Sequence, residues 1–174
     1  MPVGLEPKRR TAILVPVPAG VDTTGWPLID DVGEEFYFKR DAGALFVSPA
    51  DATPSPPMDA YAEELDVAVG VERLERATTL VIRRVSRSWA GLRTFAWDGS
   101  PVVGSDGLVE GFFWLAGQGG YGVKTAPALS RACAALIRHG RLPDDVLRSG
   151  VTSSDLSPTR LRDSLSRSLR TSLS

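Results

Sequence analysis

A glycine-rich loop that leads into an alanine-rich helix constrains this chain more than any other feature. Residues 111–117 are typical of a short apolar strand, and residues 117–122 carry four glycines. The run 123–138 then places Leu129, Cys133 and Ile137 on one side of a predicted buried helix. Gly140 predicts the C-cap of this helix, and Pro127 fits the helix if it lies in the first turn.

Such a strand–loop–helix unit has two interpretations. Glycines let a backbone approach a ligand closely, and a helix N-terminus offers free N–H groups and a positive dipole end. The unit therefore suits an anion or an electron-rich ligand atom. A tight turn between a buried strand and a buried helix explains the same pattern. The spacing matches neither the dinucleotide fingerprint nor a P-loop, so the loop alone leaves both interpretations open.

The remaining chain predicts an α+β fold with a mixed, largely antiparallel sheet. Prolines and glycines separate runs of β-forming residues, and a change to helical spacing of apolar residues predicts an amphipathic helix over 58–76. Residues 40–43 are typical of a turn that closes a hairpin. The expected strands are 11–17, 35–39, 44–48, 78–85, 88–95, 101–104 and 111–117.

Composition excludes several classes of function. With 43% hydrophobic and 24% charged residues and a net charge of −1, the chain has no broad electrostatic footprint for nucleic acid or an anionic membrane. The apolar run near the N-terminus is too short for a membrane span or a signal-peptide core. Cys133 and His139 are single residues of their kind, so they provide neither a disulfide nor a metal site. A cytoplasmic location fits this cysteine usage.

Several sequence blocks occur in an order that identifies a family. They are G-L-E-P-K-R-R at 4–10, F-Y-F-K-R-D-A-G at 36–43, S-P-A at 48–50, E-R-A-T-T-L-V-I-R-R at 75–84, W-A-G-L-R-T-F at 89–95, P-V-V-G at 101–104 and G-F-F-W-L-A-G-Q-G-G-Y-G-V-K-T-A-P-A at 111–128. Together they resemble the C-terminal half of the FAD-dependent D-amino-acid oxidase and dehydrogenase superfamily, with the greatest similarity to D-arginine dehydrogenase-like enzymes. The resemblance implies a substrate-binding domain over 1–100, the C-terminal segment of an FAD-binding domain over 101–150 and a partly disordered tail over 151–174.

The resemblance also implies residue roles in oxidising the CH–NH₂ group of an amino acid by hydride transfer to the flavin. Arg93 matches the arginine that binds the substrate carboxylate, for which a planar guanidinium is suited. Tyr37 and Arg10 match further carboxylate contacts. The backbones of Gly91 and Gly120 match positions that line the substrate. The loop that would face the flavin comprises Gly119, Gly120, Tyr121, Gly122 and Val123.

Ordinary structural roles compete with some of these assignments. The run at 8–10 is typical of a solvated basic surface, and Tyr37 lies between two phenylalanines that suggest packing. Trp89 is more typical of a core or an interface than of catalysis. Lys124 departs from the D-arginine enzymes, which carry a neutral amide there, and it adds a third possible cation near the carboxylate.

One part of the family pattern has no counterpart in the sequence. Members of the family open with a strand–G-x-G-x-x-G–helix unit and a later acidic residue for the ribose, and no segment here matches it. FAD would then have only a partial site. Three explanations stay open: one half of a split enzyme completed by a separate FAD-binding chain, a truncated inactive fragment, or a free-standing amino-acid-binding domain without flavin.

Overall fold

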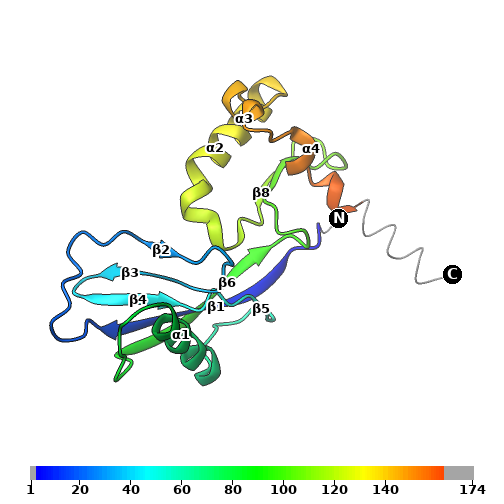
Figure 1. Ribbon diagram of the computed structural model, residues 1–174. Coiled ribbons are helices and arrows are strands. Elements are labelled where there is room, and N and C mark those ends of the chain that lie inside the picture. Colours follow the sequence, from blue (N-terminus) through cyan, green and yellow to red (C-terminus); the bar gives the residue numbers. More distant parts are fainter. Residues whose placement is uncertain (1–2, 163–174) are drawn as a thin grey trace. The chain divides into compact units, whose positions relative to one another are not determined.

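The computed structural model describes residues 3–162, and these form two compact units. Unit 1 joins Met1–Pro7 to Arg93–Ser174, and unit 2 is the continuous segment Lys8–Leu92. The α+β class expected from the sequence is confirmed, since each unit combines antiparallel strands with helices (Figure 1). The domain limits at residues 100 and 150 stay predictions. The expected tail from residue 163 onward lies outside the described residues.

Unit 2 is an antiparallel sheet with one helix against it (Figure 1). The strand order is β2-β3-β4-β1-β5, and β6 pairs with β1 outside that path. The predicted hairpin is confirmed, with Phe38 opposite Val47 and Lys39 opposite Phe46. The elements are β1 Glu6–Pro16, β2 Ile29–Asp30, β3 Tyr37–Asp41, β4 Ala44–Ser48, β5 Thr53–Pro54, α1 Glu64–Ala77 and β6 Arg87–Phe95.

The core of unit 2 lies on the sheet face that α1 covers. Alternate strand residues point to this face because successive side chains of a strand project to opposite sides. Gly70 of α1 lies so close to β1 that a Cβ atom there would be 2.6 Å from Cδ1 of Ile13. The buried apolar side chains of this core are Ile13, Val15, Phe36, Phe38, Leu45, Val47, Leu74 and Leu80.

Two expectations for unit 2 were wrong. Helix α1 begins at Glu64 and not at residue 58, because Glu63 is extended and its carboxylate accepts a hydrogen bond from Arg9. Residues 78–85 form no strand. The Glu75 side chain accepts a hydrogen bond from the Ile82 N–H (2.7 Å), which takes the place of a sheet partner, while Leu80 packs into the core.

Unit 1 is built on a hairpin with helices packed against it. The expected short strands are confirmed as β7 Val102–Ser105 and β8 Phe113–Ala116, which pair antiparallel. After the single turn η1 Gly119–Tyr121 come the helices α2 Gly122–His139, α3 Asp144–Arg148 and α4 Ser153–Leu156. Two buried clusters result, one between α2 and the hairpin and one that joins Val3 to Ala96, Val102 and Leu161.

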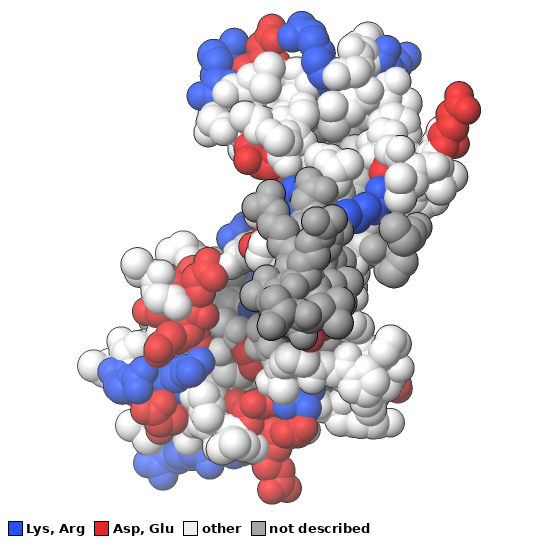
Figure 2. All heavy atoms as spheres, turned by 90° about the vertical axis from the view of Figure 1, so that its right-hand side faces the viewer, with Lys and Arg blue, Asp and Glu red and all other residues white. Residues whose placement is uncertain are grey.

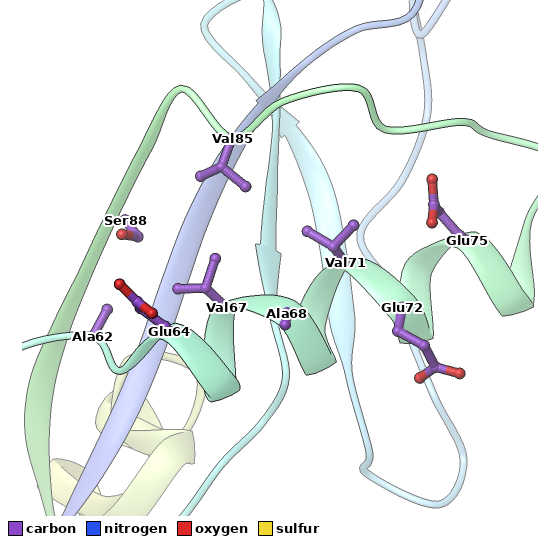
Figure 3. A pocket seen from close by; sticks show the side chains of 9 residues that line it. All are labelled: Ala62, Glu64, Val67, Ala68, Val71, Glu72, Glu75, Val85 and Ser88. Atoms are coloured by element: carbon purple, nitrogen blue, oxygen red, sulfur yellow. The ribbon is translucent and has the colours of Figure 1, made fainter.

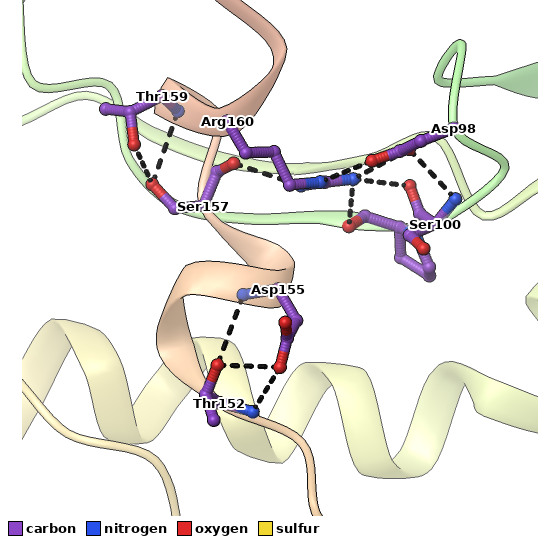
Figure 4. Close-up of polar contacts among 8 residues, drawn as sticks. Asp98, Ser100, Thr152, Asp155, Ser157, Thr159 and Arg160 are labelled. Atoms are coloured by element: carbon purple, nitrogen blue, oxygen red, sulfur yellow. Dashed lines mark hydrogen bonds and ion pairs between the residues drawn. The ribbon is translucent and has the colours of Figure 1, made fainter. Parts of the chain in front are cut away.

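The segment after α3 is held by side-chain hydrogen bonds (Figure 4). Thr152 and Asp155 form a reciprocal capping box at the start of α4. Arg160 then donates from Nε to Oδ2 of Asp98 (2.7 Å) and from Nη2 to the Ser100 carbonyl (2.8 Å). Residues 151–162 are therefore an integral part of unit 1.

Helix α2 agrees with the sequence except at its proline and at Ile137, which was expected on the buried side and is 54% exposed. Gly140 ends the helix in a left-handed conformation (φ 68°), and Cys133 is buried, as predicted. Pro127 is the sixth residue of α2 and not part of its first turn, because the helix already begins at Gly122. Among residues 3–162, no helix combines the length and apolarity that a membrane span requires.

Candidate functional site

Two neighbouring arginines of β1 have opposite environments. Arg9 points toward α1, where its guanidinium donates to Glu63 and, over 2.8 Å, to Asp66. Arg10 is the next residue of the strand, so its side chain leaves the other face of the sheet. The Nε atoms of both arginines are buried and have no hydrogen-bond partner among the described residues, but the structure gives no ion pair for the Arg10 guanidinium within residues 3–162. The basic run therefore contains one neutralised arginine and one that lacks a carboxylate in residues 3–162.

Tyr37 shares the sheet face of Arg10. Tyr37 pairs with Ser48 of β4, so the two side chains lie on the same face. Leu14 of β1 pairs with Phe46 of β4, so the even-numbered residues of β1, including Arg10, lie on the face of Phe46 and Ser48. Strand β4 lies between β3 and β1, so these two strands are roughly 10 Å apart across the sheet, and Arg10 lies two residues along β1 from the position level with Tyr37. A small carboxylate could bridge two side chains of this length.

Aromatic rings continue across this face. Tyr37 stacks against Phe46 with ring centroids 6.0 Å apart, and Phe46 meets the edge of Trp89 at 5.7 Å. Because Trp89 contacts Phe46, strand alternation places Gly91 on this side as well. We call the sheet face of unit 2 opposite α1, with Arg10, Tyr37, Phe46 and Trp89, the open face.

A groove of about 510 Å³ lies on the opposite side of unit 2 (Figure 3). Its floor is formed by valines of α1 and of the following segment, and Glu64 and Ser88 lie at one end. The residues that line it include neither Arg10 nor Tyr37. The groove and the open face are therefore separate features, and only the open face carries residues predicted from the sequence.

In unit 1, the glycine loop presents the N-terminus of α2. No acidic residue lies in the first turn of α2, and within residues 3–162 the N-cap residue Tyr121 makes no side-chain capping hydrogen bond, so these N–H groups suit an electron-rich ligand. Nζ of Lys124 lies 4.6 Å from the ring centroid of Tyr121, which brings together two residues predicted separately. Gly120 and Val123 are exposed.

Arg93 lies near the end of β6 and is exposed. It belongs to unit 1 with Gly120 and Lys124, whereas Arg10, Tyr37 and Gly91 belong to unit 2. The structure therefore brings Arg10 and Tyr37 onto one face and Tyr121 and Lys124 into contact. The two groups are not placed relative to each other.

Sequence reasoning missed Phe46 and the position of Lys39 beside it. Nζ of Lys39 lies 5.7 Å from the centroid of the Phe46 ring. The four residues 44–47 are all apolar, so the alternation of the strand is hidden and Phe46 cannot be assigned to a face by hydropathy. The available signal was the hairpin register, which follows from the turn at 40–43 and pairs Lys39 with Phe46.

Charged side chains are distributed without separation by sign on the surface that can be seen in Figure 2. Acidic and basic residues of unit 2 alternate over this face. Several of them form exposed ion pairs, such as Arg76 with Glu35 and Glu72. Exposed pairs of this kind contribute little to stability.

We expect Gly119→Ala to destabilise unit 1 by about 1–3 kcal/mol, because a Cβ atom would lie 2.6 Å from Cε1 of Phe95 and the residue has a positive φ of 54°. Urea unfolding of the chain followed by circular dichroism measures this effect. Gly122→Ala is the matched control, since its φ is helical and the nearest side-chain atom, Cβ of Gln118, would be 3.4 Å away. A change within about 0.5 kcal/mol is expected there. Equal midpoints for both variants would contradict the close contact at Gly119.

Comparisons with known proteins identify the family of this chain. The model of the family described as FAD dependent oxidoreductase matches residues 2–136. The FAD-dependent oxidoreductase domain-containing protein 1 of Xenopus laevis is 30% identical over 143 residues, which are 78% of this chain and 28% of that protein. The Bos taurus protein of the same name is 26% identical over 142 residues, or 29% of its length. The chain thus spans less than a third of these curated relatives.

Solved structures share the fold. L-proline dehydrogenase from P. horikoshii superposes with a TM-score of 0.72 at 20% identity, over 94% of this chain and 42% of that chain. Glycine oxidase from Geobacillus kaustophilus gives a TM-score of 0.63 at 19% identity, over 79% and 36%. At these identities the likeness extends to the fold and not to the substrate.

Proposed function

Because this chain belongs to the FAD-dependent oxidoreductase family, we propose that it forms the substrate-binding part of an enzyme that oxidises the CH–NH₂ group of an amino acid, with a D-amino acid as substrate. The observation that carries the proposal is the position of Arg10 and Tyr37 on one sheet face, while Arg9 on the other face is paired with Glu63 and Asp66. A guanidinium forms strong hydrogen bonds to a carboxylate, so an anionic ligand would give Arg10 a partner of opposite charge. The carboxylate of an amino acid meets this need.

The proposed carboxylate contacts are shared among several residues. Arg10 of β1 supplies positive charge on the open face. The hydroxyl of Tyr37, on β3, donates a hydrogen bond to the same carboxylate. By family resemblance, Arg93 binds the same carboxylate with its planar guanidinium. The family resemblance also implies Lys124 as a further cation and the carbonyls of Gly91 and Gly120 as acceptors for the substrate amine. Fixing both ends of a small substrate orients its Cα–H bond.

The loop from Gly119 to Val123 would hold the flavin ring edge, where the N-terminus of α2 stabilises negative charge. FAD, when bound, supplies the acceptor for the hydride that leaves Cα. The substrate nitrogen loses a proton to solvent as the C=N bond forms, and water then converts the imino acid to an oxo acid and ammonia. The residues of this chain bind and orient the substrate.

The rest of the FAD site would come from a segment outside these 174 residues, in the same protein or in a separate chain. The exposed residues of α2 support this part of the proposal. Val123 is 95% exposed and Ile137 is 54% exposed. Apolar side chains on a helix surface are typical of a face that another protein segment covers.

The experiment compares the chain alone with the chain produced together with the segment encoded immediately upstream, whether that segment belongs to the same protein or to a separate chain; this second preparation is called the pair. We expect a flavin absorbance spectrum that D-amino acids bleach in the pair only. Arg10→Met in the pair should keep the flavin spectrum and raise KM by about tenfold or more, because one charged contact to the carboxylate is lost. Colourless protein in both preparations would refute the redox proposal. Amino-acid binding by such colourless protein would instead establish a flavin-free binding domain.

A further inference from the structure

We infer that Phe46 and Trp89 extend the carboxylate site of the open face into an aromatic strip that selects large, uncharged substrate side chains. The inference rests on the proposed function, because it assumes that an amino acid binds at Arg10 and Tyr37. It adds the class of side chain that the site accepts. The aromatic strip is defined as Tyr37, Phe46 and Trp89, which all belong to unit 2.

The strip begins at a predicted substrate contact and leads away from it. Tyr37 and Phe46 are nearly parallel, with an interplanar angle of 25°, and Trp89 then meets Phe46 at 65°. The three rings come from β3, β4 and β6, which are rigid parts of one sheet. A substrate with its carboxylate at Arg10 and Tyr37 would thus find apolar surface directly beside that carboxylate.

Packing of the core does not account for these rings. The core of unit 2 lies on the α1 face, where Phe38 and Leu45 are buried, while Phe46 is only half-buried and Trp89 is 38% exposed. An exposed tryptophan beside a half-buried phenylalanine offers aromatic surface to a ligand. Such surface binds an aromatic or large apolar group with a preference for offset or edge-on contact.

Two cations already occupy positions over the strip. Nζ of Lys39 lies 5.7 Å from the Phe46 centroid, and Cζ of Arg87 lies 5.6 Å from the Trp89 centroid. The nearby Asp41 carboxylate is paired with Lys39 at 3.4 Å, so it offers little attraction to a further cation. A substrate ammonium or guanidinium side chain would meet like charge here. The strip therefore favours phenylalanine-like side chains over arginine-like ones.

The test has a binding arm and a kinetic arm. In the binding arm, calorimetry measures D-phenylalanine, D-alanine and D-arginine against the full 174-residue chain. We expect D-phenylalanine to bind at least tenfold more tightly than either of the others. Trp89→Leu and Phe46→Leu should each remove most of that preference while leaving the affinity for D-alanine within about threefold. Tyr61→Leu is the matched control, since Tyr61 is a 72% exposed aromatic residue of unit 2 outside the strip.

In the kinetic arm, the flavin-containing pair is assayed with the same three substrates. Trp89→Leu should lower kcat/KM for D-phenylalanine by about ten- to fiftyfold and change that for D-alanine by less than about threefold. Preferential binding without any flavin reduction would uphold the strip and refute the redox proposal. Flavin reduction with equal losses for all three substrates would refute the strip alone. Equal affinities, or no binding of D-phenylalanine to the chain, would also overturn the strip.

Discussion

Arg93→Lys is expected to lower kcat/KM for amino-acid oxidation by about ten- to several-hundred-fold in the flavin-containing enzyme. Lysine keeps the positive charge but loses the planar pair of N–H donors that matches a carboxylate. Loss of a charged hydrogen-bond pair corresponds to roughly 1.5–3 kcal/mol of transition-state stabilisation. Most of the change should appear in KM, because the carboxylate is bound in both the ground state and the transition state. Steady-state kinetics with a D-amino acid provides the measurement.

The matched control is Arg141→Lys. Arg141 belongs to the same unit and forms an exposed ion pair with Asp144 at 2.7 Å. A change of less than about twofold is expected there, because exposed ion pairs contribute little. If Arg93→Lys leaves kcat/KM as high as this control does, the carboxylate role of Arg93 is wrong.

Asp106→Asn is expected to lower the thermal unfolding midpoint of the chain by on the order of 10 °C. Asp106 is 1% exposed and lies in the turn between β7 and β8. Its carboxylate accepts hydrogen bonds from Trp114 Nε1 (2.7 Å), from the N–H groups of Leu108 and Val109, and from Arg162. An amide replaces the negative charge beside Arg162 and turns one acceptor into a donor that faces other donors.

The same carboxylate should make stability depend on pH. The hydrogen bond from Trp114, together with those from Arg162 and the turn, lowers the pKa of Asp106 from 3.8 to about 2. The folded state therefore binds this proton less tightly than the unfolded state does. The stabilisation is fully present above about pH 4 and is lost as the pH falls toward 2.

Thermal unfolding followed by circular dichroism between pH 2 and 6 tests both effects. The unfolding midpoint of Asp106→Asn should fall less steeply with acid than that of the wild type. Asp144→Asn, at an exposed ion pair of the same unit, should shift the midpoint by no more than a degree or two. Parallel curves for the wild type and Asp106→Asn would show that Asp106 does not contribute this pH dependence.

Local sequence signals predicted the elements that depend on nearby residues. The hairpin of β3 and β4 follows from its turn, and α2 follows from its helical spacing and the glycine at its end. The segment 78–85 has equally strong β-forming composition, yet the Glu75 side chain accepts the Ile82 N–H and no strand forms. That outcome depends on a contact from the preceding helix, which propensity does not contain.

The candidate site could be predicted only in part, because its arrangement also depends on contacts with other elements. The family resemblance predicted Arg10, Tyr37 and the 119–123 loop as site residues. The basic composition of the run 8–10, however, does not distinguish Arg9 from Arg10. Only the position of α1 shows that Glu63 and Asp66 neutralise Arg9 and leave Arg10 on the other face. The contact between Tyr121 and Lys124 likewise depends on the turn that starts α2.

The division of the chain has a consequence for its synthesis. Unit 2 is continuous, so its sheet and α1 can form once residue 92 has left the ribosome. Unit 1 cannot close so early, because its buried cluster joins Val3 to Leu161. During translation of the intervening residues, Val3 and the apolar hairpin around β8 lack their final partners. The nascent chain thus passes through a stage in which unit 2 is folded and unit 1 still exposes apolar residues. Slow translation of residues 93–161 would lengthen the time for which chaperones and proteases can reach unit 1.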